Sequence, residues 1–136
     1  MSALDDRFTV ENYKQLAELI NKGLKIYLAG PMSGIPNNNF EVFDTAAAHL
    51  REIGYQVFNP ADNDRKMWGS LENIAKYANY RDCLRADLNW ILDHAEAIAL
   101  LPGWDKSRGA NIEKQLSEIL KLKVIYLKDP AYNPPV

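Results

Sequence analysis

The sequence predicts an α/β fold, a three-layer sandwich in which helices cover both faces of a parallel sheet of four or five strands. Short apolar runs alternate with helical stretches along the chain, as in proteins built from β-α-β units. Each run is apolar along its whole length, which is typical of strands buried on both faces. The chain has 136 residues and no repeat or internal linker, so we expect a single domain over residues 1–136.

The first expected element is an amphipathic helix over residues 9–22, an extension before the core of the domain. Thr9 is a suitable N-cap, and Gly23 is a typical stop after the last helical turn. The continuous apolar run 24–30 then predicts the first strand, because a Gly-Pro pair, a strong break, closes it.

The next elements run to the middle of the chain. Apolar residues at helical spacing predict a helix over 40–54, and the run 55–60 predicts the second strand. Residues 61–69 look irregular. The stretch 70–95 predicts a long helical segment that is open to a single break.

The last third of the chain repeats the alternation of strand and helix. We expect a strand over 96–102, a helix over 110–121 and a fourth strand over 123–127. The tail 128–136 contains too many prolines to continue either pattern, so we treat it as an extension.

Composition excludes several classes of function. The formal net charge is −2, with acids and bases mixed along the chain, so no basic stripe is available for polymeric nucleic acid. No segment reaches the length of about 18 apolar residues that a membrane span needs. The lone Cys83 and two histidines provide neither a disulfide nor a spaced set of metal ligands. We expect a cytoplasmic protein without a membrane partner, metal or cofactor.

Ligands of parallel α/β sheets bind beyond the carboxyl ends of the strands. Three loops occupy such positions in this sequence, at residues 30–36, 59–63 and 102–109. The last of them leads into a helix whose second turn carries Glu113. The start of that helix suits an anion, because its first N–H groups have no partner within the helix.

Two carboxyl groups stand out against this background. Glu113 could simply complement the helix dipole, as acids near helix starts often do. Asp87 is less ordinary, because its neighbours three and four positions away include Cys83, Leu84 and Trp90, which are apolar. A carboxyl on such a face must be paired or hold its proton, and a protonated carboxyl can act as a general acid.

Simpler interpretations remain for both Asp87 and Tyr27. Asp87 could lie at the edge of the apolar face and reach solvent, Arg81 or Lys76. Tyr27 lies within an apolar strand, where it could be a packing aromatic or a buried hydroxyl that needs a partner such as Glu113.

Four motifs in order, "YLAGPMSG", "FNPAD", "DLNWILDHAEAIALLPGW" and "SRGANIE", resemble the nucleoside 2-deoxyribosyltransferase-like superfamily. Within it the chain is most similar to a phage and bacterial domain of unknown function of the DUF4406 type. It is more distantly similar to 2′-deoxynucleoside 5′-monophosphate N-glycosidases. The resemblance covers residues 25–127 and implies a flavodoxin- or Rossmann-like fold.

The resemblance also implies roles for individual residues. Glu113 matches the nucleophile that attacks C1′ of the deoxyribose, and Asp87 matches the carboxylate that handles the proton of the base. Tyr27 matches a tyrosine whose hydroxyl orients the nucleophile. A carboxylate and an acid are also what cleavage of a glycosidic bond requires, because the transition state resembles an oxocarbenium ion.

A second set of residues is expected to contact the substrate. Ser107 matches a serine that contacts a 5′-phosphate, and Gly30 and Gly109 match glycines that let the backbone approach sugar and phosphate. The hydrolases carry a serine after the first glycine, where this chain has Pro31, so Ser33 or the cations of the last loop would have to replace that contact. The expected substrate-binding residues are Gly30, Pro31, Met32, Ser33, Asn59, Pro60, Trp68, Ser107, Arg108, Gly109 and Ala110.

The sequence therefore predicts an enzyme that cleaves or transfers at the N-glycosidic bond of a small (deoxy)nucleoside 5′-monophosphate or nucleoside. The alternative is a catalytically silent module that binds or senses a nucleotide, which would need the same pocket. The resemblance further implies a homodimer or homotetramer, in which a neighbour completes the site.

Overall fold

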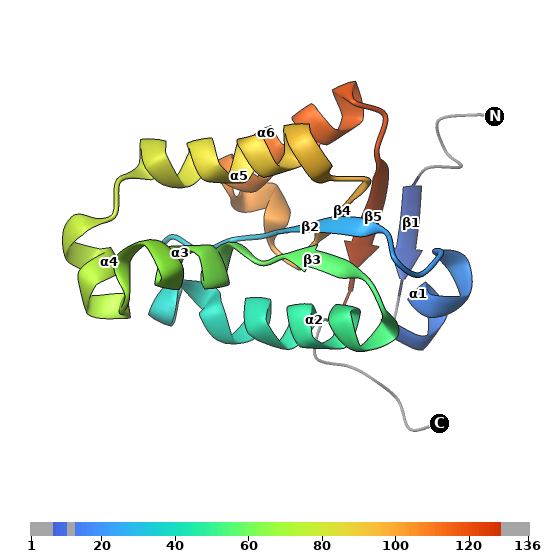
Figure 1. The fold of residues 1–136 in the computed structure, drawn as a ribbon, viewed down its shortest axis with the longest axis horizontal. Coiled ribbons are helices and arrows are strands. Elements are labelled where there is room, and N and C mark those ends of the chain that lie inside the picture. The colour runs from blue at the N-terminus through green and yellow to red at the C-terminus, as the bar shows by residue number, and fades with distance from the viewer. Residues whose placement is uncertain (1–6, 11–12, 129–136) are drawn as a thin grey trace.

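The computed structural model describes residues 7–10 and 13–128 (Figure 1). Within these residues, five parallel strands form one sheet in the order β1-β5-β4-β2-β3. The strands are β1 (Arg7–Val10), β2 (Lys25–Ala29), β3 (Gln56–Phe58), β4 (Ala97–Leu100) and β5 (Lys123–Leu127). The predicted α/β sandwich with a parallel sheet is confirmed, and its topology is consistent with a Rossmann- or flavodoxin-like fold.

Helices cover both faces of this sheet. Figure 1 shows α5 and α6 on one side and α1 and α2 on the other. The helices are α1 (Tyr13–Leu19), α2 (Phe40–Ile53), α3 (Pro60–Trp68), α4 (Leu71–Tyr77), α5 (Tyr80–His94) and α6 (Arg108–Ile119), with the short 3-10 helices η2 (Pro36–Asn39) and η3 (Trp104–Lys106). No helix in the described part of the chain combines the length and the apolar character needed to cross a bilayer.

The alternation of side chains along β2 divides the core into two halves. Ile26 and Leu28 pack with the residues of α1 and α2. Tyr27 and Ala29 point to the opposite face and pack with α5 and α6. Tyr27 is therefore placed on the same face of the sheet as the two helices that carry Asp87 and Glu113.

The N-terminal prediction was wrong in one respect. The expected helix 9–22 would start at Thr9, but Thr9 lies in β1, in register with Tyr126 of β5. The helix α1 starts later, at Tyr13. Strand pairing at the edge of the sheet decides this segment, and only four residues take part, too few for a clear periodic signal in the sequence.

The segment 61–69 also differs from the prediction, because most of it belongs to α3. Asn59 caps this helix by accepting a hydrogen bond from the N–H of Ala61 at 3.0 Å, and Pro60 occupies the first turn. A polar composition hides the helix, since its few apolar residues give no extended stripe.

The other predicted boundaries lie close to the observed ones. The long helical segment 70–95 is broken once, between α4 and α5, where the Asn79 side chain caps α5 by accepting from the N–H of Arg81 at 2.8 Å. Helix α6 begins at Arg108, two residues before the expected start. Of the predicted tail, residues 129–136 lie outside the described part of the chain.

The order of the strands creates a crevice at one end of the sheet. From β2 the chain passes to the neighbouring β3 on one side, whereas from β4 it passes to β5 on the other. The connections therefore diverge between β2 and β4, which are hydrogen-bonded neighbours. Ligands of such sheets bind at this point, beyond the carboxyl ends of the strands.

Candidate active site

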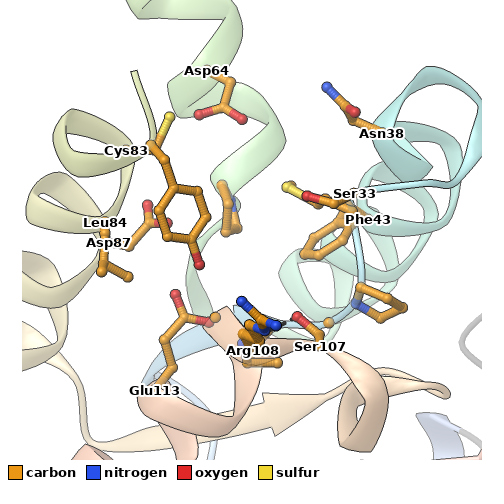
Figure 2. Close-up of a pocket in the computed structure, with 18 of the residues that line it drawn as sticks. Ser33, Asn38, Phe43, Asp64, Cys83, Leu84, Asp87, Ser107, Arg108 and Glu113 are labelled. Atoms are coloured by element: carbon orange, nitrogen blue, oxygen red, sulfur yellow. Dashed lines mark hydrogen bonds between the residues drawn. The ribbon is translucent and has the colours of Figure 1, made fainter. Parts of the chain in front are cut away.

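A cavity of about 1060 Å³ lies beyond the carboxyl ends of β2 and β4 (Figure 2). Residues from α3, α4, α5 and α6 complete its walls. Pockets for small molecules commonly have volumes of about 300–1,000 Å³, so this cavity can enclose a nucleotide. Twelve of the fourteen predicted site residues line it: Tyr27, Gly30, Pro31, Met32, Ser33, Pro60, Asp87, Ser107, Arg108, Gly109, Ala110 and Glu113.

Two buried side chains in the wall of the cavity are joined by a hydrogen bond. The Tyr27 hydroxyl donates to Oε2 of Glu113 at 2.5 Å. Tyr27 is fully buried and Glu113 is 6% exposed. The ring of Tyr27 stacks on Phe58 at 5.4 Å between centroids and contacts Trp90 at 6.4 Å. These aromatic contacts hold the hydroxyl, and the hydroxyl in turn orients the carboxyl group.

This contact decides between the alternatives for Glu113 and Tyr27. Glu113 lies in the second turn of α6, and its side chain faces the cavity (Figure 2). A carboxyl that only complemented the helix dipole would lie at the helix start, in solvent. Tyr27 likewise does more than pack, because its hydroxyl has a defined acceptor.

Asp87 faces the same cavity from α5, and its Oδ1 atom is buried without a hydrogen-bond partner. Lys76, one alternative partner, pairs with Glu72 at 3.2 Å instead. No salt bridge joins Asp87 to another residue of the described ranges. A buried oxygen without a donor is costly as an anion, so this environment favours a protonated Asp87.

Burial sets the protonation of this site. Loss of solvent raises the pKa of Asp87 to about 7, and the nearby Asp64 adds to the effect. Burial also raises the pKa of Glu113 to about 8, while the hydrogen bond from Tyr27 opposes that rise. The pKa of Tyr27 is raised too, by burial and then by Glu113. The two carboxyl groups thus titrate as an interacting pair around neutral pH.

The hydrogen bonds indicate where a shared proton resides. Tyr27 donates to Glu113, which stabilises the ionised form of Glu113. Tyr27 also contributes a hydrogen bond that lowers the pKa of Asp87, although Oδ1 of Asp87 has no partner. Burial raises the pKa of Glu113 to about 8 and that of Asp87 to about 7, so a single shared proton resides more readily on Glu113. A general acid and a nucleophile need the reverse distribution, which the hydrogen bond from Tyr27 to Glu113 promotes.

The N-terminus of α6 forms another part of the wall. Ser107 is the N-cap, and its Oγ accepts a hydrogen bond from the N–H of Ala110 at 3.2 Å. A hydroxyl group that accepts one hydrogen bond still has its own proton to donate. Figure 2 shows Arg108 next to Ser107, at the edge of the cavity. Together these groups form a surface suited to an anion.

Two glycines near the cavity are closely packed, and at Gly30 the packing leaves no room for a Cβ atom. A Cβ atom on Gly30 would lie 2.8 Å from Cβ of Leu101, closer than the sheet allows. A Cβ atom on Gly109 would lie 3.1 Å from the hydroxyl of Tyr80. Gly30 thus lets the ends of β2 and β4 meet, a packing role that accompanies its position in the cavity wall.

Two predicted substrate-binding residues do not line the cavity. Asn59 is buried beneath α3, where its side chain caps the helix and donates to Oδ1 of Asp44 at 3.0 Å. Trp68 packs against the core on the side of α1 and α2. Both positions are explained by packing within the fold.

The cavity is also lined by polar residues that the sequence did not indicate as site residues: Asn38, Asp64, Tyr80 and Cys83. Asp64 belongs to α3, which covers most of the segment 61–69 that the sequence predicts to be irregular. The Asn-Pro pair at its start, a cap followed by proline, was the available signal for that helix. Cys83 lies four residues before Asp87, so helical spacing places both on one face of α5.

Metal binding finds no support in the arrangement of side chains. Across residues 7–10 and 13–128, no group of three or more His, Cys, Asp or Glu side chains is arranged to hold a metal ion. The chemistry available in the cavity is that of the carboxyl groups, the tyrosine hydroxyls and the donors at the start of α6.

Comparison with known proteins identifies one relationship. The family model described as "Domain of unknown function (DUF4406)" matches residues 24–126, which is most of the chain. The matched region contains β2, β3, β4, β5 except for its last residue, and every residue that lines the cavity. No curated protein matches the chain.

Proposed function

Given that this chain belongs to the DUF4406 family, we propose that it is an enzyme that cleaves or transfers at an N-glycosidic bond. The substrate is a small (deoxy)nucleoside 5′-monophosphate or nucleoside. One observation carries the proposal: the buried Glu113 carboxyl accepts a hydrogen bond from Tyr27 in the cavity that also contains Asp87. A pocket built only for binding has no need of two buried carboxyl groups with raised pKa values.

In the first step, an oxygen of Glu113 attacks C1′ of the sugar and forms an ester bond. The bond between C1′ and the base nitrogen breaks at the same carbon, and its electron pair leaves with the base. Asp87 transfers its proton to the base, which departs neutral. Tyr27 donates to Oε2 of Glu113 and keeps the carboxylate oriented, which leaves Oε1 for the attack.

The second step regenerates the enzyme. Water, or a second base, attacks C1′ and breaks the ester to Glu113. Asp87, now ionised, accepts the proton of the attacking group. Two displacements at one carbon retain its configuration, as in retaining glycosidases.

The second candidate is a catalytically silent nucleotide-binding module. It is favoured by the raised pKa of Glu113, about 8, because a protonated carboxyl is not a nucleophile. The enzymatic proposal requires Glu113 to react in its ionised form while Asp87 carries the proton, and the hydrogen bond from Tyr27 favours that form of Glu113.

One experiment tests the proposal and separates the two candidates. The protein is incubated with a panel of ribo- and deoxynucleosides and their 5′-monophosphates, and free base is detected by chromatography. The proposal expects release of base from at least one compound, or its exchange when a second base is added. Binding without release of any base would support the silent module instead.

A further inference from the structure

A third carboxyl group, Asp64, faces the cavity and has no part in the proposed reaction. It lies on α3 and is 7% exposed. Figure 2 shows it across the cavity from Ser107 and Arg108. Asp64 raises the pKa of Asp87, and Asp87 raises that of Glu113. Figure 2 shows the three carboxyl groups along one side of the cavity, with Asp87 between Glu113 and Asp64.

The protein supplies few donors to Asp64. The next residue, Arg65, turns away and binds Asp44 at 2.8 Å and Asp62 at 2.7 Å. Among the described residues, Asp64 forms no salt bridge. The group that contributes a hydrogen bond to it is the thiol of Cys83, a weak donor.

A buried carboxyl group in this situation retains acceptor capacity. Leaving such a group without donors costs free energy. Burial raises the pKa of Asp64 only to about 6, so the group is mainly ionised at neutral pH. Because the side chain faces the cavity, N–H groups of a bound ligand can satisfy it.

The two ends of the cavity differ in charge. At one end, Lys106 and Arg108 form no salt bridge with another described residue. At the other end lie Asp64 and Asp87, with Glu113 between the ends (Figure 2). A complementary ligand has an anionic group at one end and N–H donors at the other.

A nucleotide bound for the proposed reaction has this polarity. With its phosphate at the start of α6 and C1′ at Glu113, its base extends past Asp87 toward Asp64. We propose that Asp64 is a specificity-determining residue that selects adenine and cytosine, whose exocyclic amino group occupies the ring position of a carbonyl in hypoxanthine and uracil. This inference rests on the proposed function, which defines the end of the cavity that holds the base.

The physical reason is the match between donors and acceptors. An exocyclic amino group presents N–H donors to the Asp64 carboxylate. The carbonyl group that replaces it in uracil, thymine or hypoxanthine has no proton to donate. Its lone pairs instead face those of the carboxylate, and the two groups repel each other. Sites built to bond an N–H group reject analogues that lack it, because a buried polar group is then left unpaired.

Matched ligands test this inference directly. Binding of dCMP is compared with dUMP, and of dAMP with dIMP, by calorimetry on the full chain carrying Glu113→Gln, which blocks the proposed attack and keeps an acceptor for Tyr27. The members of each pair differ in an amino or carbonyl group at one ring position. We expect the amino ligand to bind at least about tenfold more tightly in each pair.

Substitution of Asp64 provides the second comparison. In the same background, Asp64→Asn should reduce each preference to within about twofold, because an amide offers a donor as well as an acceptor. Asp93→Asn is the matched control, since Asp93 is exposed on the same helix as Asp87; it should leave the preference unchanged. Asp64→Ser serves as a second variant if the asparagine chain does not fold.

Three results of the binding comparison would overturn the inference: equal affinities within the pairs, tighter binding of the carbonyl ligands, or a preference that survives Asp64→Asn and Asp64→Ser. Failure to bind any of the four ligands would overturn it as well. These outcomes are distinct from failure of the proposed function. An unsubstituted chain that releases no base refutes the enzyme, while the affinity ratios still judge Asp64. Equal cleavage of both members of each pair refutes the role of Asp64 and leaves the enzyme in place.

Discussion

The proposed chemistry depends on a single proton carried by the Asp87 carboxyl group. Its Oδ1 atom is buried without a partner, and burial together with Asp64 raises its pKa to about 7. An acid with a pKa near the working pH is a good compromise between holding the proton and giving it away. Asp87 therefore has the properties of a general acid, and its removal should affect turnover more than folding.

We predict that Asp87→Asn keeps the fold and binds ligand but lowers kcat about a hundredfold or more, the usual effect of losing a general acid. Substrates whose bases leave easily should lose least, because they depend less on protonation. Steady-state rates and a circular-dichroism melt check this. Asp93→Asn, on the exposed side of α5, is the control; equal rates for Asp87→Asn and the control would remove Asp87 from the mechanism.

The proposed attack by Glu113 leads to a second prediction about a single residue. If its carboxylate attacks C1′, a 2′-fluoro substrate analogue should leave a sugar attached to Glu113, which mass spectrometry of the digested protein would locate. Glu113→Ala should abolish the adduct and the activity. Retained configuration at C1′ is expected as well. An inverted product, or full activity of the alanine chain, would exclude a covalent intermediate on Glu113.

Among the elements, α6 contributes most to the site, because its start faces one end of the cavity and its second turn carries Glu113. Ser107 caps the helix through the N–H of Ala110, and the first N–H groups of a helix have no partner within it. Arg108 adds a positive charge at the same place (Figure 2). A 5′-phosphate would meet donors, a cation and the positive end of the helix dipole.

We predict that a deoxynucleoside 5′-monophosphate has a kcat/KM more than about tenfold higher than the same nucleoside without phosphate, since charge-assisted hydrogen bonds are strong. Arg108→Gln should reduce this ratio, whereas Arg81→Gln, at an exposed position on α5, should not. Pro31 lines the cavity and has no hydroxyl group to donate, so the ratio measures whether the start of α6 suffices to hold a phosphate. A preference for the free nucleoside would indicate a transferase that exchanges bases.

At the scale of the whole molecule, the buried carboxyl groups link stability to pH. In the unfolded chain their pKa values are near 4, whereas folding raises those of Asp87 and Glu113 to about 7 and about 8. Between these limits the folded state binds more protons than the unfolded state. The free energy of unfolding must then fall as pH rises from about 4 to about 8.

Urea unfolding at pH 5, 6, 7 and 8 measures this dependence. Glu113→Gln removes one titrating group, so its free energy of unfolding should fall less steeply with pH, by up to about 1.4 kcal/mol per pH unit. The free energy of unfolding of Asp93→Asn should change with pH as steeply as that of the unsubstituted chain. Stability that rises over this range, or identical slopes for Glu113→Gln and the unsubstituted chain, would contradict the raised pKa values.

Large apolar side chains remain exposed on several helices, including Tyr77, Leu92 and Ile119. Exposed apolar side chains of this kind favour self-association. We predict a homodimer or homotetramer at micromolar concentration, measured by light scattering. The mass of a single chain at that concentration would contradict this prediction.

Much of the fold could be predicted from local patterns. The apolar runs that became β2, β3, β4 and β5 lie within their expected ranges, because strands buried on both faces leave a continuous signal. Strand β1 has four residues and depends on pairing with β5, so no local pattern revealed it. Helix α3 was missed because its composition is polar, and Asp64 was missed with it.

By itself, the sequence determined the parallel α/β architecture, the loops at the carboxyl ends of the strands, and the choice of Tyr27, Asp87 and Glu113 as candidates. Only the tertiary structure decided that these three share one cavity, that Asn59 and Trp68 lie outside it, and that Asp64 belongs to it. Periodicity and helix caps are local properties and can be read along the chain. Strand order and the burial of a carboxyl group arise from contacts between distant segments, so they exist only once the chain has folded.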